Sequence, residues 1–350
     1  MTSAKISTKS SKGLTRFALQ ELLVPIALLL LVSWFFATRS PDLLLNIQQT
    51  LCLFVMVLAL QIFVGNSGVL SFGHGAFAMI GAFAAGLATA PQRIKAHALA
   101  LQNLLPFLVN FHLGFYVSLL FAAIMGGLVA GITGTFLMRL NGLAAGIATF
   151  ALLGVSYDFF FNNIHVGPGS QALPRVPNFA HFWEPLALAV GVMVIVYLFN
   201  ISPWGRMLRA TREDNLAAPA TGISILKVRW IAFTISGAIA GLAGGMLTHV
   251  VGTLQVQDYY LPFTFSTLAM LIIGGSGSLW GALLGTLIFD AIGQILLYIE
   301  QGKAIVGLTI HLPIGARALI VSASLIVMLL WRTSGITRGR EFALNFRRAK

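Results

Sequence analysis

Charged residues are scarce in this chain, and cysteine is almost absent. Only 9% of its 350 residues are charged, whereas a soluble globular domain usually carries about 25%. So few charges cannot cover a surface in water, which excludes a soluble globular protein and requires that most of the outer surface contact lipid. Hydrophobic residues make up 57% of the chain. The composition therefore predicts an all-α integral membrane protein, a polytopic bundle whose helices satisfy their own backbone polar groups.

Three further absences narrow the function. The single cysteine, Cys52, excludes an internal disulfide and lies in an apolar segment, where we expect it to be buried. The seven histidines are scattered, so no metal site is predicted. The sequence lacks a Gly-x-x-x-x-Gly-Lys-Ser/Thr phosphate loop, and it shows no nucleophile paired with a base. We therefore expect no cofactor bound by this chain and no enzymatic activity.

Ten apolar runs are candidates for membrane-spanning helices, each of which needs about 20 residues. They are 22–38, 43–64, 69–90, 115–138, 143–163, 184–201, 229–251, 263–275, 279–299 and 314–332. The eighth is short, and it is either a span or a re-entrant half-helix. The stretch 99–111 is apolar but contains Pro106, and we expect it to lie on the surface. The first run has no cleavage site after it, so we expect a retained helix.

Basic residues indicate the orientation of these spans. The net charge of +12 does not predict nucleic-acid binding, because the charges lie in loops and termini between apolar segments. With a cytoplasmic N-terminus and about ten spans, 16 of the 22 Lys and Arg residues lie in the cytoplasm, as the positive-inside rule requires. The predicted organisation is a cytoplasmic basic tail at 1–20, a transmembrane domain at 21–332 and a second cytoplasmic basic tail at 333–350.

Glycine is abundant, with 36 residues, and several recur every four positions. On a helix this spacing makes a flat strip on which a neighbouring backbone can approach closely. Such packing could lie within this subunit or against a second membrane subunit, and the sequence leaves both possibilities open. The clearest strips are Gly237, Gly241 and Gly245, and Gly277, Gly281 and Gly285.

The loop at 203–228 joins the sixth and seventh spans and is rich in charge. Pro203 can open a short helix, and Gly222 can end one in a left-handed conformation. We expect an amphipathic cytoplasmic segment outside the bilayer. It is either an ordinary basic loop or a docking element for a soluble partner.

Three blocks of sequence resemble the LivM type of branched-chain amino acid permeases of ABC importers. One block contains Ala217-Ala218-x-x-x-Gly222, similar to the coupling motif of such permeases, preceded by Gly205-Arg206, Arg209-Ala210 and Arg212-Glu213-Asp214. The second runs from Gly274 to Gly285, and the third from Gly68 to Ala82. The chain departs from the family pattern in the loop 166–173 and, in the fifth span, matches its carboxylate only approximately with Asp158.

The resemblance implies a division of labour. Such permeases lie in the bacterial inner membrane and pair there with a similar but distinct LivH-like permease. Two cytoplasmic ABC ATPases, which bind ATP and Mg²⁺, and a periplasmic substrate-binding protein complete the importer. The resemblance also implies import of branched-chain or other hydrophobic amino acids, while related permeases handle urea or short amides. The residues expected to couple to the ATPase are Gly205, Arg206, Arg209, Arg212, Glu213, Asp214, Ala217, Ala218 and Gly222.

Polar groups at membrane depth are costly, so each is a candidate for the translocation path. These candidates are Asn66, Ser67, Ser71, His74, Asp158 and Asn162. His74 is either bonded to a neighbouring helix or lines a path at a broken helix. Asp158 either meets water at a helix end or contacts an amine or a binding protein, while Asp290 is expected to be paired within the bundle. A self-sufficient transporter or channel remains an alternative, but it needs no docking loop.

Overall fold

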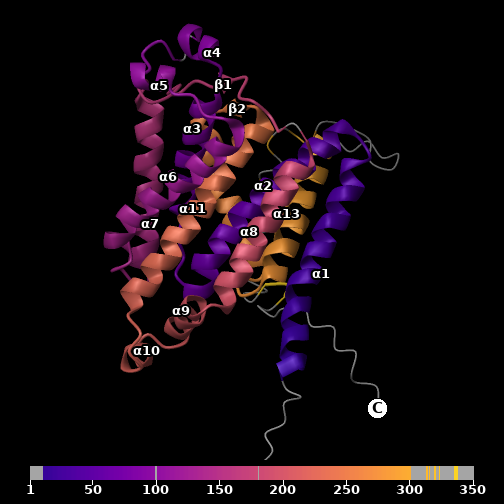
Figure 1. Cartoon of the computed structure of the whole chain (residues 1–350), viewed down its shortest axis with the longest axis vertical. Coiled ribbons are helices and arrows are strands. Elements are labelled where there is room, and N and C mark those ends of the chain that lie inside the picture. Colours follow the sequence, from indigo (N-terminus) through magenta and orange to yellow (C-terminus); the bar gives the residue numbers. More distant parts are fainter. Residues whose placement is uncertain are drawn as a thin grey trace, which may run out of the picture.

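The computed structural model describes residues 11–98, 101–179 and 181–300, with short pieces at 313, 315, 319–320, 323 and 335–337. In this part the chain is a helical bundle with one two-stranded ladder (Figure 1). The elements are α1 (Ser11–Ala37), α2 (Pro41–Leu60), η1 (Gln61–Gly65), α3 (His74–Thr89), α4 (Gln92–His97), α5 (Pro106–Asn110), α6 (Phe115–Leu137), α7 (Gly142–Asn162), β1 (Leu173–Pro174), α8 (Trp183–Ile201), α9 (Pro203–Glu213), α10 (Ala217–Ala220), α11 (Ile225–Val251), β2 (Thr253–Leu254), η3 (Val256–Tyr259), α12 (Leu261–Gly274) and α13 (Leu279–Glu300).

Six helical segments in the described part are long and apolar enough to cross a membrane, so the protein is a multi-pass membrane protein. They are Pro41–Gly65, Phe115–Leu137, Gly142–Asn162, Trp183–Ile201, Ile225–Val251 and Leu279–Glu300. Two shorter apolar helices, Glu21–Ala37 and His74–Thr89, match the first and third predicted runs. The short eighth run forms the 14-residue helix α12. The predicted tenth span, 314–332, the tail 333–350 and residues 1–10 of the first tail lie largely outside the described residues, so the number of spans stays a prediction.

One predicted span differs from the observed helix at its start. The third run was expected from residue 69, but α3 begins only at His74. The preceding helix ends in a π-helical turn, η1, and Gly68 then takes a positive φ of 71°. A left-handed residue cannot continue a helix, so the chain between η1 and α3 is broken at the end of the bundle.

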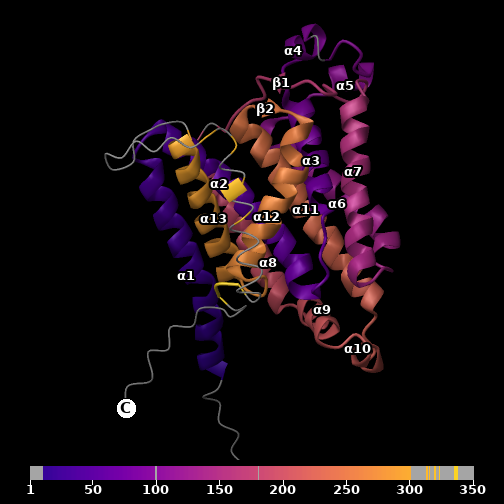
Figure 2. The same cartoon turned by 180° about the vertical axis from the view of Figure 1, so that it is seen from behind.

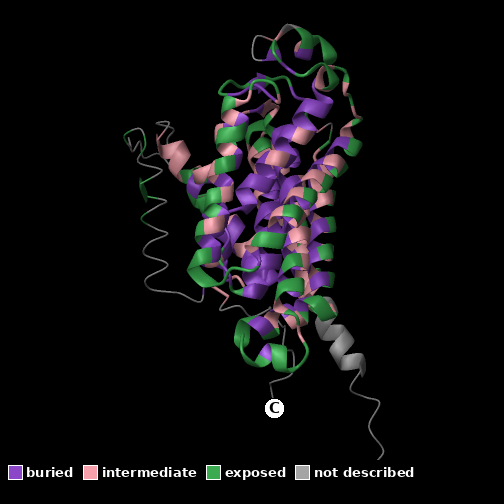
Figure 3. Cartoon of the chain, turned by 90° about the vertical axis from the view of Figure 1, so that its left-hand side faces the viewer, coloured by how far each residue is buried: buried purple, intermediate pink, exposed green. Residues whose placement is uncertain are grey.

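The core of the bundle lies around α2, α3 and α11. Figure 3 shows buried residues concentrated in the middle of the molecule and exposed ones on the outer helices. Cys52 lies on α2 and is 1% exposed, as predicted. By contrast, α7 presents large apolar side chains outward, with Leu143 82% and Val155 67% exposed. An apolar surface of this kind suits lipid or another membrane subunit.

Glycines let α11 approach its neighbours α3 and α6 closely. A Cβ on Gly241 would stand 2.5 Å from the carbonyl oxygen of Ala122 on α6, too close for any real contact. A Cβ on Gly237 would collide with the Cβ of Ala130, also on α6, and Gly245 packs against the same helix. Among the described neighbours, this strip therefore packs within the subunit, as small-residue strips in membranes do.

The second glycine strip is only partly as predicted. Gly281 and Gly285 on α13 pack against the last turn of α12, where a Cβ on either would collide with a backbone carbonyl. Gly277 does not join them, because it lies exposed in the turn between α12 and α13. The four-residue spacing of Gly277, Gly281 and Gly285 begins in this turn, before α13 starts at Leu279. The expectation that Gly277 packs on a helix was therefore wrong.

The two ends of the bundle carry different structures (Figures 1 and 2). One end holds α4, α5 and the ladder of β1 with β2, while the other holds α9, α10 and the start of α1. Lys95 fastens the first end, because its Nζ is buried and donates to the carbonyls of Leu108 (3.2 Å) and Phe111 (2.5 Å). These carbonyls lie at the end of α5, where no backbone N–H of the same helix is available to donate to them. Residues 101–111 form no span, as expected, although Leu101 and Leu104 are buried against this end of the bundle.

Candidate functional site

The α9 helix follows from local sequence signals. Ser202 caps it, since its Oγ accepts from the backbone N–H of Gly205 (3.2 Å), and Pro203 occupies the first turn, where it needs no donor. One face, with Gly205, Leu208 and Thr211, is buried against the bundle. Arg206, Arg212 and Glu213 are exposed, and Arg209 is half-buried. The predicted amphipathic segment outside the spans is therefore present, and it is an ordered helix.

A second capping interaction joins α9 to α10. The Asp214 carboxylate accepts from the backbone N–H groups of Leu216 (2.7 Å) and Ala217 (3.0 Å). These two bonds hold the pKa of Asp214 below its ordinary value, because they favour the ionised form. Gly222 takes a φ of 83° just beyond α10, which is the left-handed conformation expected at a helix end. The Ala217-Ala218-x-x-x-Gly222 motif thus forms a compact turn.

Part of this segment faces away from the bundle. The exposed residues of α9 and α10 are Trp204, Arg206, Ala210, Arg212, Glu213, Asp214, Asn215, Leu216, Ala217, Pro219 and Ala220. Leu216 is 91% exposed, although an apolar side chain gains by leaving water. Together with α9, α10 lies at one end of the bundle (Figure 1). We call this exposed face the outer face of the α9–α10 segment.

Two arginines of the predicted docking motif bond back to the bundle: Arg209, which is half-buried, and Arg212, which also stays exposed on the outer face. Arg209 donates from Nη1 to Asn66 Oδ1 and from Nη2 to the carbonyl of Asn200, each at 2.8 Å. Arg212 donates from Nη1 to the carbonyl of Gly65 (2.6 Å). Burial first, and then the charge of Arg206, lower the pKa of Arg209, yet an arginine keeps its charge. These bonds anchor α9 to the break between η1 and α3.

The break is itself held by side-chain amides. Asn66 Nδ2 donates to Asn200 Oδ1 (2.9 Å) and to the carbonyl of Ile62 (3.0 Å), while Asn200 Nδ2 donates to Gln61 Oε1 (3.4 Å). The network therefore joins η1, α8 and α9. Buried polar networks of this kind fix one arrangement when they are satisfied, and π-helical turns are frequent at functional sites.

The turn between α12 and α13 reaches the same place. A Cβ on Gly65 would collide with the carbonyl oxygen of Ser276, so these two backbones touch. Gly65 thus accepts a hydrogen bond from Arg212 on α9 and also contacts the backbone of Ser276 in the α12–α13 turn. Two of the sequence blocks that carry the resemblance meet at this point, next to the third.

Arg229 ties the segment to a further loop. It is 3% exposed and donates to Asn141 Oδ1 (2.5 Å), before α7, and to Asn215 Oδ1 (3.2 Å), between α9 and α10. Sequence reasoning missed Asn141, Asn200 and Asn215 as members of this site. Single amides at helix ends form no pattern, so only their proximity in the fold could identify them.

The predicted path residues fall into separate places. Asn66 and Ser67 are 3% exposed and belong to the break described above. Ser71 bonds to His74, whose Nδ1 lies 3.0 Å from the Ser71 Oγ and whose Nε2 lies 2.9 Å from the Ser236 Oγ. His74 is fully buried and is packed among the rings of Phe63, Phe77 and Phe233. These contacts match the first interpretation of His74, a histidine bonded to a neighbouring helix.

Asp158 and Asn162 lie elsewhere, on the exposed side of α7 near its end. Asn162 Nδ2 donates to the backbone carbonyl of Asp158 (3.0 Å). The six candidates therefore lie at three separate places, and their role in translocation stays a prediction. Within the described residues, no group of three or more His, Cys, Asp and Glu could hold a metal ion.

Comparison with known proteins gives one family. The model of the family "Branched-chain amino acid transport system / permease component" matches residues 44–331. The permease protein LivM of the high-affinity branched-chain amino acid transport system of Escherichia coli (strain K12) is 24% identical over 91% of this chain and 75% of its own length. No solved structure matches the chain.

Two other relatives carry different names. The autoinducer 2 import system permease protein LsrC of Enterobacter sp. (strain 638) is 28% identical over 51% of this chain and 55% of its own length. The probable branched-chain amino acid transport permease protein LivH of Methanocaldococcus jannaschii is 23% identical over 70% of this chain and 77% of its own length. The family thus includes permeases named for unlike solutes.

Proposed function

Since the chain belongs to the family of branched-chain amino acid transport system permease components, we propose that it forms the translocation path of an ABC importer for branched-chain or other hydrophobic amino acids. A permease of this family is a membrane transport subunit and not an enzyme, and ATP is bound by separate ATPase subunits. The similarity to LivM covers nearly the whole chain, whereas that to LsrC covers about half. This difference supports an amino acid as the solute.

The α9–α10 segment carries the proposal. It lies outside the spans, its outer face is exposed, and Arg209 and Arg212 fasten it to the break between η1 and α3. A soluble ATPase that moves the segment would therefore move the helix break and, through Gly65 and Ser276, the α12–α13 turn. Rigid-body coupling of this kind transmits a movement without any nucleotide site in the permease itself.

The same segment supports an orientation. The start of α1 lies at the same end of the bundle as α9 and α10 (Figure 2). Of the basic residues counted above, this end carries Arg206, Arg209, Arg212, Lys227 and Arg229, on α9 and the start of α11. We place it in the cytoplasm of a bacterial inner membrane, with about ten spans and both termini inside. The opposite end, with α4 and α5, then faces the periplasm and a substrate-binding protein.

The proposed complex contains a second, LivH-like permease, two ABC ATPases and the binding protein. The similarity to a LivH of Methanocaldococcus jannaschii shows that one family contains both permease types. A pair of related membrane subunits would cover apolar faces such as that of α7, which is exposed in the isolated chain.

The first test is the composition of the complex. We would tag this chain, purify it from its native host and identify its partners by mass spectrometry of the intact assembly. We expect a second permease and two ATPases. A lone chain or a homo-oligomer, under conditions that preserve a control ABC importer, would refute the proposal and favour a self-sufficient transporter or channel.

A charge-reversal variant then tests the outer face. Arg206→Glu changes an exposed residue of α9, and we expect it to lose the ATPases while retaining the second permease. Arg139→Glu is the matched control, because Arg139 is also exposed and basic and precedes α7 at the same end. Equal ATPase binding by both variants would show that the ATPase docks elsewhere.

The solute is tested through the binding protein. Its ligands are identified by titrating the purified protein with leucine, isoleucine, valine, urea and acetamide. Tight binding of branched-chain amino acids is expected. Tight binding of urea or acetamide alone would reassign the importer to short amides within the same family.

A further inference from the structure

Arg229 is a buried cation of which the coupling route through Arg209 and Arg212 makes no use. It lies near the start of α11 and is 3% exposed. In the part of the chain that the structure describes, no carboxylate lies within ion-pair distance of it, and its Nε–H has no hydrogen-bond partner. A buried charge without a counter-ion is costly and adds little to stability. In a membrane helix such a residue is a candidate for a functional role.

The two bonds that Arg229 makes join two separate loops. Its Nη1 donates to Asn141 Oδ1 (2.5 Å), and its Nη2 donates to Asn215 Oδ1 (3.2 Å). Asn141 is the residue before α7, and Asn215 lies between α9 and α10. One guanidinium holds both amides in fixed relative positions, because its donors form a planar fork. The start of α7 is thereby connected to the α9–α10 segment through a single side chain of α11.

Asn141 makes this bond instead of its usual one. An asparagine in the N-cap position of a helix typically accepts from a backbone N–H of the first turn. Asn141 occupies the N-cap position of α7, but its side chain makes no cap bond. Its oxygen accepts from Arg229. The connection to another element thus takes the place of a local bond that would serve α7 alone.

The α7 helix is well placed to move. It lies on the outside of the bundle (Figures 1 and 2) and buries one stripe of residues, namely Ala145, Gly146, Thr149, Leu153, Ser156 and Phe160. In its middle, Thr149 Oγ1 accepts from the backbone N–H of Phe72 (3.2 Å), which lies in the break between η1 and α3. Arg209 and Arg212 hold that break to α9. The α9–α10 segment therefore reaches α7 at two levels, at its start through Arg229 and in its middle through the break.

We propose that Arg229 is a positioning residue of the transport cycle, which makes the start of α7 move together with the α9–α10 segment. It acts through Asn141 and Asn215 and not on the solute itself. A movement that the ATPase imposes on α10 then shifts α7 as a rigid body, because the break carries the same movement to the middle of the helix. The inference rests on the proposed function, since it takes the ATPase to bind the outer face of the α9–α10 segment.

The test breaks the connection at each asparagine in turn. Both asparagines are exposed, so their replacement leaves the core unaltered, whereas replacing the buried Arg229 can prevent folding. In proteoliposomes that contain the complete complex, we expect Asn141→Ala and Asn215→Ala each to lower uptake per ATP hydrolysed at least about three-fold. Because the two bonds act in series, the double variant should be no worse than either single variant.

Two further variants separate positioning from a merely structural role. Asn141→Asp keeps an oxygen for Arg229 and adds an opposite charge, so we expect it to retain the native ratio of uptake to ATP hydrolysis. Arg139→Met is the matched control, because it alters an exposed residue of the same linker and neither partner of Arg229. It should also retain the native ratio.

The outcomes distinguish this inference from the proposed function. A native complex that contains no ATPase would refute the proposed function. If the ATPases are present, native coupling in both alanine variants would overturn the role of Arg229 alone. A double variant whose loss is the product of the two single losses would also overturn it, because the two asparagines would then act separately and not through one guanidinium.

Discussion

Replacing Arg209 by methionine is expected to uncouple ATP hydrolysis from transport while leaving the complex assembled. Methionine keeps an unbranched apolar stem, although a shorter one, and donates no hydrogen bond. The change removes both 2.8 Å bonds, to Asn66 Oδ1 and to the carbonyl of Asn200. The outer face is unaltered, so the ATPase should still bind. What is lost is one of the two anchors between α9 and the helix break, while Arg212 still bonds to Gly65.

The size of the effect follows from these bonds. A hydrogen bond to a charged group contributes about 1.5–3 kcal/mol. Arg209 is half-buried, so water replaces part of each bond and the lower end of the range applies. Two bonds then give about 3 kcal/mol, which corresponds to a shift of roughly 150-fold in the equilibrium between anchored and released α9. Uptake per ATP hydrolysed should fall at least about ten-fold.

The assay is ATP-driven uptake by the purified complex in proteoliposomes, with ATP hydrolysis measured in parallel. Arg139→Met is the matched control and should behave as the native complex, since Arg139 is exposed at the same end. The reasoning would be refuted if Arg209→Met transported solute at the native ratio. It would also be refuted if the variant lost its ATPases as Arg206→Glu is expected to, because Arg209 would then be part of the docking surface.

Three further changes test other parts of the fold. Gly244→Ala should destabilise the protein by about 1–3 kcal/mol or prevent folding, measured by thermal unfolding, since its Cβ would collide with the Ala78 carbonyl. Asp214→Ala should speed hydrogen exchange of the two amides that it caps. In the native chain that cap is present above the ordinary carboxyl pKa of 3.8 and is lost as the pH falls through the lowered value. Lys95→Met should make the α4–α5 end more sensitive to protease, because the carbonyls of Leu108 and Phe111 lose their donor.

Each of these changes has a control on the same chain. Gly191→Ala should leave the unfolding temperature unchanged or slightly higher, since Gly191 on α8 has open space around its Cα. Glu213→Ala should not alter exchange of the capped amides. Arg93→Met, an exposed change on α4, should not alter proteolysis. If a control matched its partner variant, the contact named for that variant would not be responsible for the effect.

The spans were largely predictable because hydrophobic length is a local property of the sequence. The run at 229–251 corresponds to α11, and the run at 115–138 to α6. The start of α3 was harder to predict from the sequence, because residues 69–73 are apolar enough to continue a span. Gly68, which has a positive φ, lies against the side chain of Arg212 on α9, a neighbour that is distant in the sequence.

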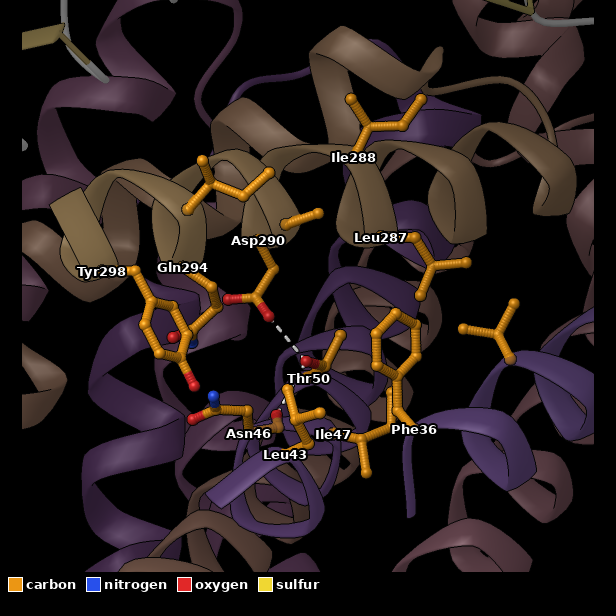
Figure 4. Close-up of a pocket in the computed structure, with 13 residues that line it drawn as sticks. Phe36, Leu43, Asn46, Ile47, Thr50, Leu287, Ile288, Asp290, Gln294 and Tyr298 are labelled. Atoms are coloured by element: carbon orange, nitrogen blue, oxygen red, sulfur yellow. Dashed lines mark hydrogen bonds between the residues drawn. The ribbon is translucent and has the colours of Figure 1, made fainter. Parts of the chain in front are cut away.

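The position of the α9–α10 segment in the sequence was predictable, but the directions in which its side chains point were not. Pro203, the basic residues and Gly222 identify an amphipathic segment between two spans. Which arginines face the bundle depends on where Asn66 and Asn200 stand in the fold, and no periodicity within eleven residues reveals that. Asp290 was expected to be paired within the bundle, and it accepts from the Thr50 hydroxyl on α2 (2.6 Å; Figure 4). Its partner could not be identified from the sequence, because 240 residues separate the two.

The burial of Cys52 makes the native chain suitable for site-directed labelling. It is the single thiol of the sequence and is 1% exposed within α2, so thiol reagents should leave the unmodified protein unlabelled. A cysteine introduced in place of the exposed Leu216 would then be the one reactive position on the chain. A spin label or fluorophore there would report the movement of α10 during the ATP cycle, with no need to remove a native cysteine first.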